Sequence, residues 1–223
     1  MSSTPESTLT APSADLAGAP TSLLSVVPVV PVVVVDDLAH AVPLARALVA
    51  GGLPVIELTL RTPVALEAIR AIADEVPEIL LGAGTVCTPE QAEAARAAGA
   101  QFLVSPGATP TLLASMLATG LPFLPGTATV SEVLAVLEAG ISEMKFFPAE
   151  ASGGAAYLKA ISSPVPAARF CPTGGITAAS AASYLALPNV GCVGGSWLTP
   201  ADALAAGDWG RVETLAREAA ALA

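Results

Sequence analysis

The chain has 223 residues, of which 53% are hydrophobic, so it can bury a substantial core and most of it is excluded from the disordered class. Its formal net charge is −10, and its nine Lys and Arg residues are scattered, which argues against a nucleic-acid-binding surface. One histidine and three widely spaced cysteines exclude the usual Ser-His-Asp, Cys-His and multi-histidine metal sites.

The first residues differ in composition from the rest of the chain. Residues 1–22 are rich in Ser, Thr, Pro and Ala and lack the basic start of a signal peptide, so we interpret them as a disordered tail. The apolar run that follows is too short for a membrane span and is interrupted by Pro28 and Pro31. We therefore expect a cytoplasmic protein with no membrane partner, whose residues 23–223 form a single domain.

Short β-branched runs alternate with Ala/Leu/Glu-rich helical stretches along the whole domain. Strands are expected at 29–35, 54–60, 78–84, 101–106, 121–126, 142–147, 168–174 and 190–195. Helices are expected between them, for example at 38–52, 63–76, 88–100 and 129–140. Eight such units predict an α/β fold in the form of a single-domain (β/α)8 TIM barrel. An open doubly wound sheet is the alternative, but the first strand is not followed by a dinucleotide-binding glycine pattern.

Several polar residues fall on the same face of their strands. Because side chains alternate along a strand, Glu57 and Arg61 should point into the barrel lumen, and so should Lys145 and Thr173. Barrel active sites lie at the carboxyl ends of the strands. Lumen charges can also be purely structural, as paired layers that fill the core. Lys159, the other lysine, belongs to a helical stretch and is interpreted as solvated.

A buried lysine beside a carboxylate has a specific chemical use. Burial disfavours the charged form of the amine, and the neutral amine can attack a carbonyl carbon to form a Schiff base. Glu57 can then serve as the general acid/base, and Arg61 can bind a carboxylate. Because the protonated imine is itself an electron sink, this class I aldol chemistry needs neither a metal nor a cofactor.

Two Gly-Gly pairs follow the last two predicted strands, in "PTGGIT" (172–177) and "GGSWL" (194–198). Glycine exposes backbone N–H groups, and helix N-termini favour anions. Barrels often bind phosphate at these two loops, so the pairs indicate a phosphorylated small-molecule substrate.

The segments "VIELTLRTP", "GAGTV", "PFLPGTATVSE", "KFFPAE" and "RFCPTGGI" together resemble the 2-keto-3-deoxy-6-phosphogluconate (KDPG) and 2-keto-4-hydroxyglutarate (KHG) aldolase family. The resemblance implies a homotrimeric class I aldolase barrel that acts in the Entner–Doudoroff pathway. It implies that Lys145 is the Schiff-base lysine and Glu57 the acid/base, and that Arg61 and Thr85 bind the pyruvate carboxylate. It also assigns the substrate pocket to Pro106, Phe147 and Thr173, and the phosphate site to Gly174, Gly175, Gly195 and Ser196.

Other functions remain open from the sequence. The first alternative is an aldolase for the galactonate epimer of KDPG, or one acting mainly on KHG. A phosphosugar isomerase on the same barrel would use an acid/base pair without a covalent lysine. A non-catalytic assembly barrel would have no reason to place Lys, Glu and Arg in one lumen.

Overall fold

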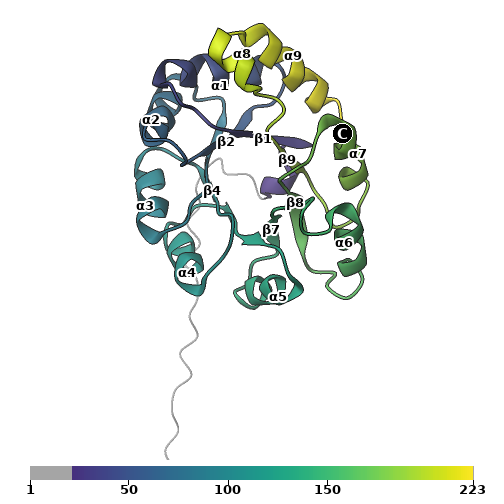
Figure 1. The fold of residues 1–223 in the computed structure, drawn as a ribbon. Coiled ribbons are helices and arrows are strands. Elements are labelled where there is room, and N and C mark those ends of the chain that lie inside the picture. Colours follow the sequence, from purple (N-terminus) through teal and green to yellow (C-terminus); the bar gives the residue numbers. More distant parts are fainter. Residues whose placement is uncertain (1–21, 223) are drawn as a thin grey trace, which may run out of the picture.

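The computed structural model describes residues 22–222 and shows parallel strands wound into a barrel inside a ring of helices (Figure 1). The strands are β1 (Val29–Val33), β2 (Val55–Thr59), β3 (Leu80–Gly84), β4 (Phe102–Val104), β5 (Phe123–Leu124), β6 (Gly126–Thr127), β7 (Glu143–Phe146), β8 (Arg169–Pro172) and β9 (Val193–Gly195). The helices are α1 (Ala41–Ala50), α2 (Ala65–Glu75), α3 (Pro89–Ala97), α4 (Pro110–Ala118), α5 (Val130–Glu138), α6 (Gly154–Ile161), α7 (Ala178–Leu185), α8 (Ala201–Ala206) and α9 (Trp209–Ala220).

The strands form two parallel groups, ordered β5-β4-β3-β2-β1-β9 and β6-β7-β8. Isolated bridges join the end of the second group to the first, through Phe170↔Val190 and Thr173↔Gly194. On the other side, β5 and β6 follow each other directly in the chain and together complete the circle. The sequence-based prediction of a (β/α)8 barrel is therefore confirmed.

The fifth barrel position departs from the prediction of one strand at 121–126. It is divided into β5 and β6, and Pro125 lies between them. Proline has no N–H to donate to a strand ladder, so pairing is interrupted at this residue. Its carbonyl still accepts a hydrogen bond from the backbone N–H of Lys145, at 3.0 Å, and so ties β7 to this position.

The helices begin with capping residues that the sequence supplies. Thr88, Thr129 and Thr177 form capping boxes at the starts of α3, α5 and α7. These caps hold the helix starts on the same side of the barrel as the carboxyl ends of the strands. Within residues 22–222, no helix combines the length and the apolar character that crossing a membrane requires.

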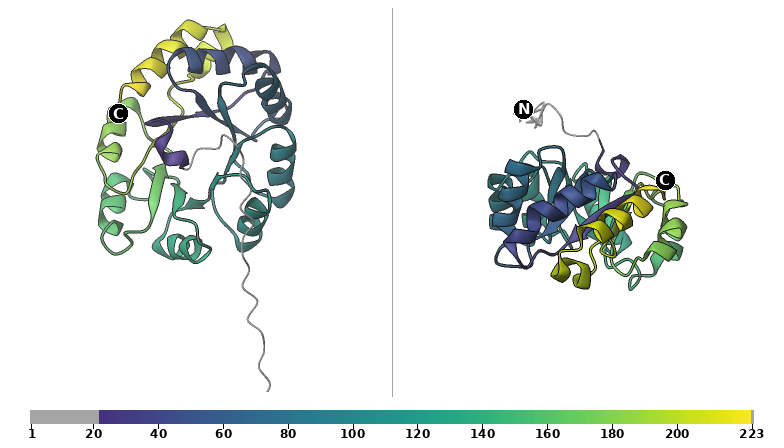
Figure 2. Two further views of the ribbon diagram at one scale, coloured as in Figure 1. Left: turned by 180° about the vertical axis from the view of Figure 1, so that it is seen from behind. Right: turned by 90° about the horizontal axis from the view of Figure 1, so that it is seen from above.

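The opposite end of the barrel is covered by the short helix η1 (Leu23–Ser25), which lies inside the ring of helices in Figure 2. The hydroxyl of Ser22 donates to Oε1 of Glu143, and the N–H of Leu23 donates to Oε2 at 3.1 Å. Leu23 and Leu24 of this helix are buried. The tail predicted at 1–22 lies outside the described residues, apart from Ser22.

Candidate active site

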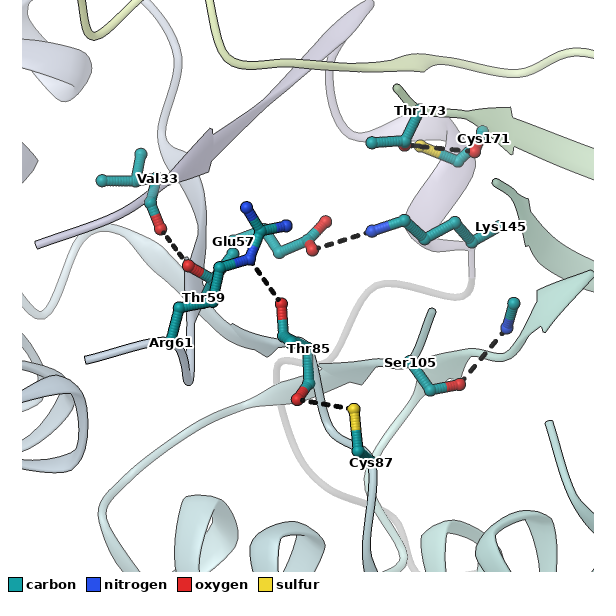
Figure 3. A network of polar contacts seen from close by, with 11 residues as sticks. Val33, Glu57, Thr59, Arg61, Thr85, Cys87, Ser105, Lys145, Cys171 and Thr173 are labelled. Atoms are coloured by element: carbon teal, nitrogen blue, oxygen red, sulfur yellow. Dashed lines mark hydrogen bonds and ion pairs between the residues drawn. The ribbon is translucent and has the colours of Figure 1, made fainter. Parts of the chain in front are cut away.

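Lys145 and Glu57 meet inside the barrel. Lys145 lies on β7 and Glu57 on β2, across the lumen from each other, and Nζ of Lys145 donates to Oε1 of Glu57 at 3.1 Å (Figure 3). Their side chains are only 4% and 2% exposed. The strand-alternation argument thus places both residues correctly. At this distance the carboxylate can accept the proton that the amine must lose before it acts as a nucleophile.

The two phenylalanines that follow Lys145 lie on the faces that strand alternation predicts. Phe147 lies on the lysine's side of β7, with its ring centroid 5.2 Å from Nζ. Phe146 points to the helices, where it stacks on Tyr157 of α6 at a centroid distance of 5.4 Å. Lys159 is exposed on α6, as expected from its helical context. The two lysines of the chain are therefore in opposite environments.

Arg61 and Thr85 form a second polar pair at the carboxyl ends of β2 and β3. Nε of Arg61 donates to Oγ1 of Thr85 at 3.2 Å (Figure 3). In the part of the chain that the structure describes, the two terminal nitrogens of Arg61 have no protein acceptor, so the guanidinium can still bind a carboxylate in a bidentate manner. Thr85 has a φ of 60°, which is strained for a β-branched residue.

The two predicted Gly-Gly segments lie side by side, because Thr173 pairs with Gly194. Gly174 and Gly175 both have left-handed backbones, with φ of 102° and 81°, which glycine adopts without strain. The ring of Phe147 packs against Gly174, and a Cβ there would lie 3.2 Å from it. Thr173 is buried beside them, close to the sulfur of Cys171.

The remaining predicted residues line the same end of the barrel. Pro106 is half-buried after β4, and its carbonyl lies against Gly126. Gly195 ends β9 and is covered by the indole of Trp197, which would lie 2.3 Å from a Cβ at this position. Ser196 is exposed and lines a cavity of about 360 Å³ between the ends of β1 and β9 and helix α8, whose lining does not include Lys145 or Glu57.

Several residues that shape the site were not assigned from the sequence. The buried hydroxyl of Thr59 donates to the carbonyl of Val33 at 2.8 Å, and that of Thr127 donates to the carbonyl of Lys145 at 3.2 Å. Ser105 is fully buried and accepts a bond from the N–H of Gly126 at 3.2 Å. Strand alternation places Thr59 in the lumen two residues after Glu57, but it gives the residue no role in the site.

Comparison with known proteins identifies the family. A model of the KDPG and KHG aldolase family matches residues 21–215. The chain belongs to this family. It is 57% identical over 198 residues to the KHG/KDPG aldolase of Escherichia coli K12, with 89% of this chain and 93% of that protein covered.

Solved structures of KDPG aldolases have the same fold. One is the enzyme from Legionella pneumophila with pyruvate captured at low pH as a covalent carbinolamine intermediate; it is 47% identical, covers 88% of this chain and 96% of that chain, and has a TM-score of 0.87. Another is the Zymomonas mobilis ZM4 enzyme with 3-phosphoglycerate, which is 48% identical, covers 90% and 94% of the two chains, and has a TM-score of 0.84. The (β/α)8 barrel of this KDPG/KHG aldolase family member is therefore shared with enzymes of known structure.

Proposed function

We propose that this chain is a class I aldolase that cleaves KDPG to pyruvate and D-glyceraldehyde 3-phosphate in the Entner–Doudoroff pathway. The observation that carries the proposal is the buried amine of Lys145, 3.1 Å from the Glu57 carboxylate, in a chain 57% identical to a KHG/KDPG aldolase. The carbinolamine captured in the Legionella pneumophila enzyme supports a covalent mechanism for this chain.

In the proposed mechanism, Lys145 passes its proton to Glu57 and attacks the C2 keto carbon of the substrate. Loss of water from the carbinolamine gives a protonated imine. The C3–C4 bond then breaks as the C4 hydroxyl loses its proton: the aldehyde leaves, and the electron pair of the broken bond forms an enamine. Protonation of the enamine at C3 and hydrolysis release pyruvate and the free amine.

The other site residues hold the substrate in the proposal. Arg61 and Thr85 bind the carboxylate next to the keto group, and Pro106, Phe147 and Thr173 form the wall around the reacting carbons. Gly174, Gly175, Gly195 and Ser196 bind the phosphate at the far end. The pairing of Thr173 with Gly194 supports this last assignment, because it brings both Gly-Gly segments to one place.

A second substrate and the assembly also belong to the proposal. We expect cleavage of KHG to pyruvate and glyoxylate, since the Escherichia coli relative is a KHG/KDPG aldolase. We expect a cytoplasmic homotrimer. Exposed apolar side chains on α4 and α5 support an intersubunit contact, with Leu117 at 48%, Leu134 at 46% and Val130 at 36% exposure. Sedimentation equilibrium tests the mass of the assembly.

The decisive experiment is borohydride reduction in the presence of pyruvate. Borohydride should fix a covalent adduct on Lys145, which peptide mass spectrometry locates. Lys145→Ala should lose both adduct and turnover, while Lys159→Ala is the matched control and should keep both. EDTA should leave the rate unchanged, because the imine is the electron sink. A label on Lys159, or turnover without any label, would show that the class I mechanism is wrong.

A further inference from the structure

Glu150 lies directly beneath the Gly174–Gly175 segment. Its backbone N–H donates to the carbonyl of Gly174 at 3.1 Å, and the preceding N–H of Ala149 donates to the carbonyl of Thr173 at 2.8 Å. A Cβ on Gly175 would lie 2.7 Å from Cγ and 2.8 Å from Cβ of Glu150. The methylene stem of Glu150 therefore supports the glycine segment, and only glycine fits above it.

The position of this carboxylate is at odds with the chemistry proposed for the segment. A phosphate bound at Gly174 and Gly175 would lie close to the negative charge of Glu150. Like charges about 4 Å apart repel by about 1 kcal/mol in water and by several times more near a protein surface. A phosphate site here needs a device that keeps the Glu150 carboxylate away from the ligand.

Tyr184 supplies that device. Its hydroxyl, on α7, donates to Oε1 of Glu150 at 2.6 Å. The other carboxylate oxygen lies towards the start of α6, 3.7 Å from where a Cβ on Gly154 would be. The carboxylate thus lies between the Tyr184 hydroxyl and the start of α6 while its stem remains under Gly175, and Glu150 as a whole is exposed. The tyrosine itself is 1% exposed, so its ring is fixed by packing.

The protonation of Tyr184 favours the same arrangement. Burial, together with the hydrogen bond to Glu150, raises the pKa of Tyr184 well above its usual value. An ordinary tyrosine, with a pKa of about 10, is already protonated in the physiological range, so the hydroxyl remains a donor to the carboxylate there. Such a bond to an ionised acceptor is stronger than one between neutral groups.

We infer that Tyr184 is a positioning residue for phosphate binding: it holds the Glu150 carboxylate away from the ligand while the Glu150 stem supports the Gly174–Gly175 segment. The inference rests on the proposed function, since it takes the phosphorylated end of the substrate to bind at these glycines. Tyr184 acts only through Glu150, and it touches neither Lys145 nor the reacting carbons in this arrangement.

The test compares Tyr184→Phe, Glu150→Gln and the double variant with the unaltered enzyme. Tyr184→Phe frees the carboxylate, so KM for KDPG should rise about five- to thirtyfold, with kcat nearly unchanged. KM for 2-keto-3-deoxygluconate, which lacks the phosphate, should not change. Glu150→Gln should bind KDPG like the unaltered enzyme, because the amide oxygen still accepts the tyrosine bond. The double variant should recover a low KM, since no charge remains to repel the phosphate.

That rescue separates positioning from a general packing defect, which removal of a charge would not repair. Equal losses on both substrates after Tyr184→Phe, or a double variant as weak as Tyr184→Phe, would overturn the inference. Calorimetric Kd values for inorganic phosphate on the same four proteins should follow the same order without any turnover. If the unaltered enzyme fails to cleave KDPG, the proposed function is wrong, and these Kd values still decide the role of Tyr184.

Discussion

The Glu57 carboxylate occupies the space that a side chain on Gly84 would fill. A Cβ on Gly84 would lie 2.3 Å from Oε1 of Glu57 and 2.8 Å from its carboxyl carbon. Oε1 is also the atom that accepts the hydrogen bond from Lys145. Because Gly84 has no side chain, the carboxylate of Glu57, the proposed acid/base, can lie next to the amine of Lys145, the proposed nucleophile.

Gly84→Ala should lower turnover far more than its effect on stability would suggest. The added methyl group must push the carboxylate away from Lys145, and losing a positioned acid/base costs about 10²–10⁴-fold in rate. Gly82→Ala is the matched control on the same strand, because the nearest atoms to its Cβ would be those of the Phe102 ring, 2.1 Å away. Overpacking should destabilise both variants by about 1–3 kcal/mol.

Assays of kcat well below both melting temperatures, together with urea unfolding, distinguish a loss of turnover from a loss of stability. Full turnover by Gly84→Ala would contradict the role given to Glu57.

The sequence predicts the barrel well because its signal is repeated in every unit. Each strand–helix unit carries its own β-branched run and its own break, so an error in one unit leaves the others intact. Strand alternation then places Lys145 and Glu57 in one lumen. It cannot reveal Gly84, because alternation says which face a residue occupies and not which neighbour presses against it.

Other features depend on contacts that no local pattern encodes. The break of the fifth strand is an exception, because the sequence itself shows Pro125, which cannot donate to the ladder. Cys171 and Cys192 are buried whereas Cys87 is exposed, a difference that the residue type alone does not predict. Glu150 is exposed, and its hydrogen bond with Tyr184, 34 residues away, is a contact that no sequence pattern indicates.

The Lys145–Glu57 pair should show strong energetic coupling. Lys145→Met leaves the Glu57 carboxylate buried without its partner, and breaking a buried pair in this way costs about 3–5 kcal/mol. Glu57→Gln likewise leaves the ammonium of Lys145 buried without a charged partner. The double variant removes both charges, so its free energy of unfolding should be closer to that of the unaltered protein than either single variant is. Urea unfolding of the four proteins measures the coupling, and simple additivity of the two losses would contradict it.

Thr85→Gly should separate stability from function. A β-branched residue at a φ of 60° is strained by about 1–3 kcal/mol, whereas glycine adopts this conformation freely. Part of the relief is offset by about 0.5–1 kcal/mol of extra backbone entropy in the unfolded chain. The free energy of unfolding should therefore stay level or rise, while KM rises because Arg61 loses its acceptor. Thr85→Ser keeps the hydroxyl and should keep the KM. A clear loss of stability in Thr85→Gly would show that the left-handed threonine is not strained.

Cys192 should make the stability of the protein fall at alkaline pH. A hydrogen bond with the sulfur of Cys171, and then burial, raise the pKa of the Cys192 thiol well above its usual value. The unfolded thiol loses its proton near pH 8.5 while the folded one keeps it, so above about pH 8.5 the unfolded state binds fewer protons. The stability that this thiol contributes is complete below that pH and should decline above it by about 1.4 kcal/mol per pH unit. Urea unfolding between about pH 8.5 and 9.5 measures the slope below the pKa of about 10 at which unfolded tyrosines ionise. Cys192→Ser should lower that slope, whatever the absolute stability of the variant, because serine does not titrate in this pH range.

Cys87→Ser, an exposed control, should leave the slope unchanged. Identical slopes in all three proteins would mean that the folded Cys192 thiol ionises as readily as the unfolded one.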